Sequence, residues 1–516
     1  MTLPNPQRNF LLIALSLAAM AIQNVAAPNV SAKDESPDPS VEVGKELFNR
    51  DWSKHKPTRG DGLGPMFNAV SCVACHEMGG VGGAGKVKHN VDLLSLVSPR
   101  PKGKSGSPLL VKRLREVHPD LDASQLTVTL HKAGYDRQGD ELKPDPDYDQ
   151  FRKAFKDAEK SQPGQLRNVT RGRLIFEISE RSTPALFGAG MIDQIPDRAL
   201  IELARHQKEN VPGISGRVPQ TPSGAVGRFG WRGQIGSLHE FVLGACVNEL
   251  GLQISASKPE PENPLDIRKW SQHPNFNPTN HSAKIPPEAR QTDLTEHECL
   301  SLTAFVGSLP APVQLNGTSL TQSEAALEGQ RLFEKIGCSD CHVQNVGPAH
   351  GIYSDLLLHD MGAGLADSVS AVPELDDSTV PFSGGYSGGF VPDQLVKITT
   401  KINQEWRTAP LWGVRDSAPY LHDGRAISLD DAIRLHGGEA ASSARKFRSL
   451  GALDRDRVIA FLSTLAPKGA RPRAVFFPNR NQGGGGFFGS GGGPGFFSIQ
   501  HQHGTGSVGL KQFSGE

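Results

Sequence analysis

An excess of charge of one sign is what this sequence most clearly lacks. Its 55 Lys and Arg residues are matched by 55 Asp and Glu residues, so the formal net charge is zero. No long basic run interrupts this balance. Proteins that bind nucleic acids or anionic membranes present a concentrated positive surface, and the composition therefore argues against both partners.

Long hydrophobic runs are scarce as well. The longest, Phe10–Ile22, is apolar apart from one serine and is too short to span a bilayer. Because Arg8 precedes it, the run is typical of a signal peptide, which we predict over residues 1–32. Two possible cleavage sites of small residues end at Ala27 and at Ala32, and the sequence does not decide between them. We expect an exported, periplasmic protein with no stable membrane span after signal cleavage.

Cysteine is rare too, with six in 516 residues, yet four of the six form two copies of one pattern. Cys72–His76 and Cys338–His342 each place two thiols three positions apart and a histidine directly after the second. The spacing is typical of haem c attachment, in which both sulfurs form thioethers and the histidine becomes an axial iron ligand. We therefore predict two covalently bound haem c groups. Their attachment residues are Cys72, Cys75, Cys338 and Cys341, and their proximal ligands are His76 and His342.

The cysteines allow other interpretations. A zinc site shared by four thiolates, or two redox-active or disulfide-forming pairs, would also use two such segments. Neither kind of site requires a histidine after each cysteine pair, whereas haem c attachment requires one. The remaining Cys246 and Cys299 suit one disulfide or two separate buried thiols, and both alternatives stay open.

Short helices are expected on either side of each haem segment. Val43–Phe48 and Glu328–Gly337 carry apolar residues at helical spacing and share the pattern Gly-x-x-Leu-Phe. Leu300–Leu309 and Val458–Leu465 are also helical in pattern, and a proline follows each. The repetition predicts a mainly α fold of two tandem cytochrome c-like haem modules with long loops and insertions.

The expected domain order follows from these segments. It is a signal peptide at 1–32, a linker at 33–42, an N-terminal haem c module with insertions at 43–315, a C-terminal haem c module at 316–468 and a disordered Gly/Phe-rich tail at 469–516. The chain has 57 Gly and 38 Pro residues, which favour extensive loops. The insertions are expected to form four helices: Ser107–Val117, Gln150–Lys160, Arg198–Gln207 and Ile235–Leu250.

Several further segments share their residues with one family. They are Gly60–Pro65 with Asn68 and Ser71–His76, Thr183–Gly188, Arg228–Trp231, Ser354–Gly362, Arg407–Gly413 and Ala418–Arg425. The last, Ala-Pro-Tyr-Leu-His-Asp-Gly-Arg, is the most specific. Together they resemble the di-haem oxidoreductases, which are related to bacterial di-haem cytochrome c peroxidases, and the resemblance covers nearly the whole mature chain.

The resemblance implies ligands for the second iron. In the peroxidases a helix after the segment matching 418–425 carries a methionine ligand, and the corresponding residue here is His436. We therefore expect His342 and His436 to bind the second haem, with Met361 as the alternative to His436. Histidine in place of methionine is expected to lower the potential of that haem, because thioether ligation favours ferrous iron.

The first haem has no comparably clear sixth ligand. His89 follows His76 across a glycine-rich loop, and in some peroxidases a histidine of this loop binds the iron and is displaced on activation. His89 is therefore the candidate distal residue. The resemblance also makes Arg425 a candidate for binding a haem propionate.

Two haems with different sixth ligands imply a division of labour. We expect a peroxidase-like oxidoreductase, in which the C-terminal haem relays electrons from a small electron-donor protein or cytochrome. The N-terminal haem would react with peroxide or another small oxidant. The alternatives are a di-haem oxygenase or oxidase of an organic substrate, and a non-catalytic di-haem electron carrier.

Overall fold

The structure is a computed structural model. It describes residues 39–54, 62–64, 66–98, 112–114, 117, 127–138, 141–156, 167–172, 174–221, 223–254, 292–315, 320–367, 379–380, 396–397 and 402–467. The chain divides into two compact units, Met1–Arg473 and Ala474–Glu516, and every described residue lies in the first. The expected signal peptide and the expected tail lie outside the described residues.

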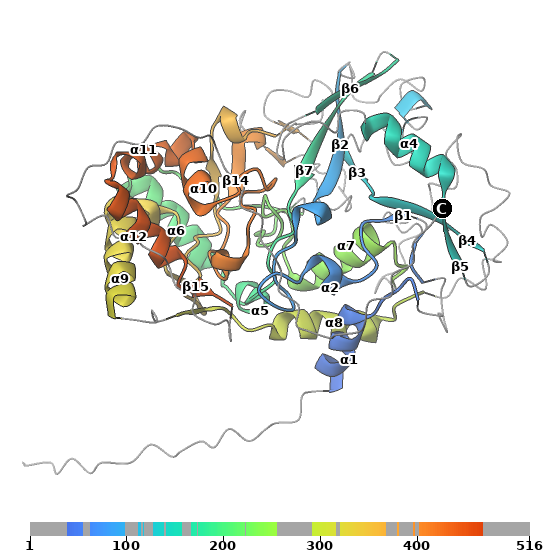
Figure 1. Ribbon diagram of the computed structural model, residues 1–516, viewed down its shortest axis with the longest axis horizontal. Helices are drawn as coiled ribbons and strands as arrows, with labels where there is room; N and C mark the ends of the chain where they lie inside the picture. The colour runs from blue at the N-terminus through green and yellow to red at the C-terminus, as the bar shows by residue number, and fades with distance from the viewer. Residues whose placement is uncertain are drawn as a thin grey trace, which may run out of the picture. The chain divides into compact units, whose positions relative to one another are not determined.

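Most of the helices are short and separated by loops (Figure 1). The α-helices are α1 (Pro39–Asn49), α2 (Cys72–Cys75), α4 (Pro146–Lys156), α5 (Ala189–Asp193), α6 (Asp197–Asn210), α7 (Leu238–Leu250), α8 (Glu296–Ser308), α9 (Leu320–Lys335), α10 (Leu429–Leu435), α11 (Ala441–Ser449) and α12 (Ala452–Leu462). The 3-10 helices are η1 (Val87–His89), η4 (Cys338–Asp340), η5 (Ala363–Leu365), η6 (Ile402–Gln404), η7 (Val414–Asp416) and η8 (Gly438–Ala440). Among the described residues, no helix combines the length and apolar character needed to cross a bilayer.

One pattern of helix packing occurs twice, α1 against α8 and α9 against α12. A Cβ atom on Gly44 would lie 1.9 Å from the carbonyl oxygen of Ser301. A Cβ atom on Gly329 would lie 1.8 Å from the carbonyl oxygen of Arg457. Only glycine lets the backbones approach this closely. The repeated Gly-x-x-Leu-Phe pattern thus reflects one helix crossing used in both halves of the chain.

The phenylalanines of the repeated pattern pack in the same way. Phe48 on α1 contacts Phe305 on α8, with ring centroids 5.2 Å apart and planes at 57°. Phe333 on α9 contacts Phe461 on α12 at 5.3 Å and 63°. Both geometries are the tilted arrangements that aromatic pairs prefer. Each crossing therefore has a buried aromatic pair beside its glycine contact.

The expectation of a mainly α fold is wrong, because the structure is mixed α and β. The two-residue strand β1 (Met66–Phe67) precedes the first haem segment. The longer strands follow it: β2 (Val91–Ser98), β3 (Thr127–Leu130), β4 (Ala133–Gln138), β5 (Glu141–Pro144), β6 (Arg167–Arg171) and β7 (Leu174–Arg181). They form an antiparallel sheet in the order β3-β2-β7-β6 and a second in the order β1-β4-β5 (Figure 1). Short strands elsewhere are β8 (Val313–Gln314), β9 (Asn345–Val346), β10 (Ala349–His350), β11 (Leu358–Asp360), β12 (Thr379–Val380), β13 (Val396–Lys397), β14 (Glu405–Arg407) and β15 (Leu465–Ala466).

The physical reason for the error is a period of two in these segments. Along β7, Leu174, Phe176 and Ile178 are buried, whereas Ile175 and Glu177 between them are not. Side chains of a strand alternate between its faces, so this burial fits a sheet with one face on a core. That core contains Leu94, Leu96, Leu114, Val128, Leu130, Phe155, Val169, Leu174, Phe176 and Ile178.

The expected helices of the insertions are found in part. Gln150–Lys160 overlaps α4, Arg198–Gln207 lies within α6, and Ile235–Leu250 contains α7. Ser107–Val117 lies mostly outside the described residues. The two remaining cysteines, Cys246 and Cys299, are buried free thiols in the core around α1, α7 and α8, not a disulfide.

Candidate functional site

The first haem segment is a single helical turn. Ser71 begins α2, and its Oγ accepts a hydrogen bond from Ala74 N at 3.2 Å. The backbone N–H of His76 donates to Cys72 O at 3.0 Å, which continues the turn past the second thiol. The turn therefore places both cysteines and the histidine side by side, as attachment to one haem requires.

His76 is held in the form that binds iron. Its Nδ1 lies 3.2 Å from Gly83 O, and its ring packs on Phe48 with centroids 6.3 Å apart. Burial lowers the pKa of His76 to about 4, so the imidazole is neutral at pH 7. A proton on Nδ1 leaves the lone pair of Nε2 for a metal, and the carbonyl partner fixes that tautomer.

The second haem segment repeats these features. The backbone N–H of His342 donates to Cys338 O at 2.9 Å, and its Nδ1 lies 2.8 Å from Tyr353 O. Its ring packs on Phe333 with centroids 6.3 Å apart, the same separation as in the first segment. Burial lowers the pKa of His342 to about 4. Gly337, in the left-handed region at φ 88°, turns the chain from α9 into the segment.

The structure places His436 opposite His342. The two ring centroids are 6.5 Å apart with planes at 53°. Nδ1 of His436, at the end of α10, lies 2.7 Å from Ala432 O, and burial lowers the pKa of His436. Both Nε2 atoms are thus left for a ligand, and the separation fits one metal ion at about 2 Å from each nitrogen.

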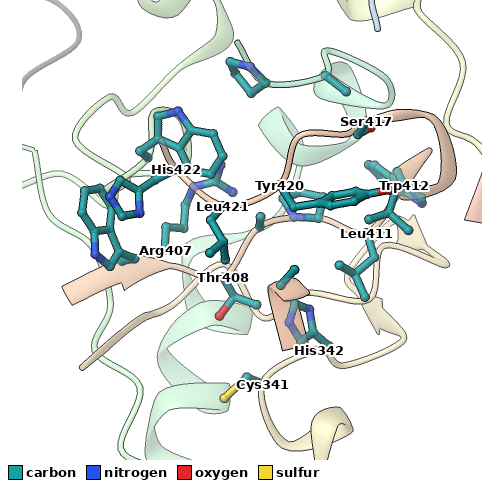
Figure 2. Close-up of a pocket in the computed structure, with 18 of the residues that line it drawn as sticks. Cys341, His342, Arg407, Thr408, Leu411, Trp412, Ser417, Tyr420, Leu421 and His422 are labelled. Atoms are coloured by element: carbon teal, nitrogen blue, oxygen red, sulfur yellow. The ribbon is translucent and has the colours of Figure 1, made fainter. Parts of the chain in front are cut away.

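A cavity of about 310 Å³ surrounds this histidine pair (Figure 2). Its lining is mostly apolar and includes both thiols of the second segment, Cys338 and Cys341. Figure 2 shows Cys341 and His342 on one wall, with Tyr420 across the cavity. Thiols, two facing imidazoles and apolar walls in one cavity fit a haem c attached from one side. Met361 also lines the cavity.

The geometry does not support a zinc site built from the four thiols. All six cysteines are described, and the one metal-compatible cluster among the described residues is Cys341, Asp355 and His359. His359 lies 2.9 Å from an Asp355 oxygen and 2.7 Å from a Glu439 oxygen, one through each ring nitrogen. Although burial alone would lower it, these hydrogen bonds raise the pKa of His359 to about 12. Both ring nitrogens of His359 are therefore engaged by carboxylates.

The comparisons with known proteins agree with this geometry. Residues 398–465, which contain α10, α11 and α12, match a family model described as "Di-haem oxidoreductase, putative peroxidase". The chain is related to the di-haem oxidoreductases. The family implies haem cofactors, in agreement with the facing histidines.

Two curated proteins match parts of this chain. It is 26% identical over 198 residues to the cytochrome c551 peroxidase of Pseudomonas aeruginosa, which is 37% of this chain and 49% of that protein. It is 30% identical over 133 residues to the hydrazine synthase subunit gamma of Kuenenia stuttgartiensis, which is 25% of this chain and 36% of that protein. The matches thus span half or less of the length of these relatives.

A solved structure of a variant of the di-haem peroxidase BthA from Burkholderia thailandensis also matches. The match covers 83% of this chain and 86% of that chain, at 13% sequence identity and a TM-score of 0.30.

The segment 418–425 joins residues far apart in the chain. The backbone N–H of Ser182 donates to His422 O at 2.8 Å, and Asn90 Nδ2 donates to Asp423 O at 3.2 Å. The His422 ring stacks on Trp406 with centroids 3.6 Å apart and planes at 13°. Since burial and nearby arginines hold the pKa of His422 well below its usual range, this imidazole is neutral.

The candidate residues Arg425 and His89 lie as follows. Arg425 donates from Nε and Nη2 to Asp423 at 2.7 Å and 2.6 Å, and from Nη1 to Gly364 O at 2.6 Å. His89 ends η1 with its side chain half-buried, and its carbonyl accepts from Thr183 Oγ1 at 3.4 Å. Sequence reasoning missed the charged His359 and its carboxylates. Asp355 lies in the same segment as His359, but Glu439 lies 80 positions further along the chain.

Proposed function

We propose that this protein is an exported di-haem c oxidoreductase of the peroxidase type. Two covalently bound haem c groups are attached at 72–76 and 338–342. Electrons enter at the site of His342 and His436 from a small electron-donor protein or cytochrome. They pass to the site of His76, where peroxide or another small oxidant is reduced.

One asymmetry between the sites supports this division of labour. His342 faces a second histidine at 6.5 Å between ring centroids. Among the described residues, His76 makes a ring contact with Phe48 and none with a second histidine. A haem iron with two histidine ligands transfers electrons, whereas one with an open or displaceable site also binds small oxidants.

Residues of the chain orient the proximal histidine at each site and keep it neutral. Gly83 O and Tyr353 O orient the proximal histidines, and burial keeps both imidazoles neutral. The cavity that His436 lines is mostly apolar, which favours a haem over water at the second site. His89, on the loop after the first segment, is the proposed distal residue.

Spectra in the oxidised, half-reduced and fully reduced states, with and without hydrogen peroxide, test the proposal. We expect one haem to be low-spin in every state and the other to show a high-spin signal that responds to peroxide. Two low-spin haems that stay inert to peroxide in all three states would reject it and favour the electron carrier.

The role of His89 is tested in the same experiment. If His89 occupies the first site, His89→Ala should give a high-spin first haem in the oxidised state, before any reduction. An oxidised spectrum identical to that of the wild type would show that His89 is not a ligand. Neither result alters the assignment of the second haem, which is read from its separate low-spin bands.

A further inference from the structure

One partly buried cation, Arg407, lines the haem cavity and has no carboxylate partner among the described residues. Arg407 lies at the end of β14, where its backbone N–H donates to Trp231 O at 3.0 Å. Its Nε donates to Gly230 O at 2.8 Å. Its Nη1 is buried and has no hydrogen-bond partner among the described residues. Half of the guanidinium is therefore anchored, and the rest lacks a partner.

Several other arginines are paired. Arg181, Arg217, Arg228 and Arg425 form ion pairs with Asp367, Glu405, Asp197 and Asp423, respectively. Burial lowers the pKa of Arg407 to about 10, so it remains charged at neutral pH. Buried charges are normally paired, because an isolated charge in a low-dielectric interior is costly. The described residues therefore supply no counter-anion for Arg407.

The position of Arg407 indicates which anion is missing. It lines the same cavity as Cys341, His342 and His436. Figure 2 shows it beside His422 and Thr408, on the side of the cavity away from Trp412. A guanidinium binds carboxylates through two parallel hydrogen bonds, and a haem carries two propionate carboxylates. We propose that Arg407 binds a propionate of the second haem.

This inference changes the expectation for Arg425. Three donors of Arg425 are already directed at Asp423 and Gly364 O. Arg407, by contrast, lines the cavity, and its Nη1 has no hydrogen-bond partner among the described residues. The inference rests on haem attachment at 338–342, which belongs to the proposed function, but not on any reaction with peroxide.

The experiment compares Arg407→Gln with Arg228→Gln. Arg228 lines the same cavity, but it pairs with Asp197 and donates to Ile195 O at 2.7 Å. The haem content of each purified protein is first counted by mass spectrometry. A wild type with no haem at 338–342 would defeat the proposed function, which separates that failure from failure of the present inference.

The readout is the midpoint potential of the second haem. Arg407→Gln should lower it, because removing a cation beside the haem favours the more positive ferric state. Arg228→Gln should leave it near the wild-type value, and Arg407→Lys should fall between wild type and Arg407→Gln. An Arg407→Gln protein with both haems and a wild-type potential would overturn the proposal.

Two further measurements complete the test. Should Arg407→Gln fail to fold, Arg407→Lys is compared with wild type by resonance Raman spectroscopy, where a shifted propionate-bending band is expected and an unchanged band would overturn the proposal. Sodium acetate tests whether the carboxylate comes from solution instead. The wild-type spectrum should not respond to acetate, and a saturable response that Arg407→Gln abolishes would reject the propionate.

Discussion

His342 and His436 face each other with ring centroids 6.5 Å apart, and Nδ1 of each ring is engaged by a backbone carbonyl. The two rings come from segments almost a hundred positions apart in the chain. A proton on each Nδ1 leaves both Nε2 lone pairs for a ligand. The separation of the two rings therefore suits the proposed binding of one metal by both histidines.

Replacing His436 should change the second haem and leave the first as it was. His436→Met is expected to raise the midpoint potential of the second haem, because thioether ligation favours ferrous iron. His436→Ala is expected to convert that haem from low-spin to high-spin in the oxidised protein. Potentiometric titration and absorption spectra measure both effects, and a low-spin population that His436→Ala leaves unchanged would reject the ligand.

Met361 offers a matched comparison at the same cavity. It was the alternative ligand, but its backbone is held by a hydrogen bond to Gln404 O at 2.9 Å in the turn before η5. Met361→Leu keeps the apolar volume and removes the sulfur. It should leave the spectrum and the potential of the second haem as in the wild type, and loss of its low-spin bands would favour Met361 over His436.

The paired glycines should be equally sensitive to substitution. A Cβ atom at Gly44 or at Gly329 would lie within 2 Å of a carbonyl oxygen on the partner helix. Each Gly→Ala change should destabilise the protein by about 1–3 kcal/mol or more, because the backbones must separate. Chemical denaturation measures this loss. Gly364→Ala is the control, since a Cβ atom there meets nothing within 4 Å and should change stability little.

The helix pairs could be predicted from the sequence because their signal is local and repeated. Gly44 and Phe48 recur as Gly329 and Phe333, and the same spacing produces the same packing. The sheet could not be found this way. β2 pairs with β7, which lies far along the chain, so the two strands are not joined by a short hairpin turn that a sequence pattern could reveal. The alternation along β7 is the local signal that could have revealed it.

The same distinction applies to the site. The two haem segments are complete within five residues each, and a family pattern led to His436. Tertiary packing decides which carboxylates these side chains meet. Among the described residues Arg407 pairs with none, whereas His359 contacts two. Arginine and histidine occur at many other positions of the chain, so residue type alone did not distinguish these two.

Haem attachment predicts different results for the two classes of cysteine. Cys75→Ala and Cys341→Ala should each abolish stable attachment at one site, so that mass spectrometry detects one full complement of covalent haem instead of two. Cys246→Ser and Cys299→Ser should retain two haems, because these thiols are buried in the helical core and belong to no haem segment. A wild-type protein that contains bound zinc and no haem would contradict this prediction.

Asp92 should be a main determinant of stability in the four-stranded sheet. On β2, it forms ion pairs with Lys132 at 3.3 Å, Arg152 at 2.6 Å and Arg167 at 3.3 Å. Asp92→Asn leaves three cations together, two of them largely buried, and breaking a buried pair costs roughly 3–5 kcal/mol. Denaturant unfolding at pH 7 measures the loss. Asp454→Asn, which breaks the partly exposed pair with Arg457, should cost no more than about 1 kcal/mol.

The effect of Asp92 should also depend on pH in a defined direction. Although burial alone would raise it, the three cations lower the pKa of Asp92 below its usual value. A carboxyl with a lowered folded-state pKa stabilises the protein above its unfolded pKa of about 3.9, and this contribution is lost as the pH falls through the folded-state value. The stability difference between wild type and Asp92→Asn should therefore be constant from pH 7 to about pH 5 and shrink below pH 4. A difference that persists unchanged at pH 2 to 3 would show that the substitution acts through packing, and not through the charge of Asp92.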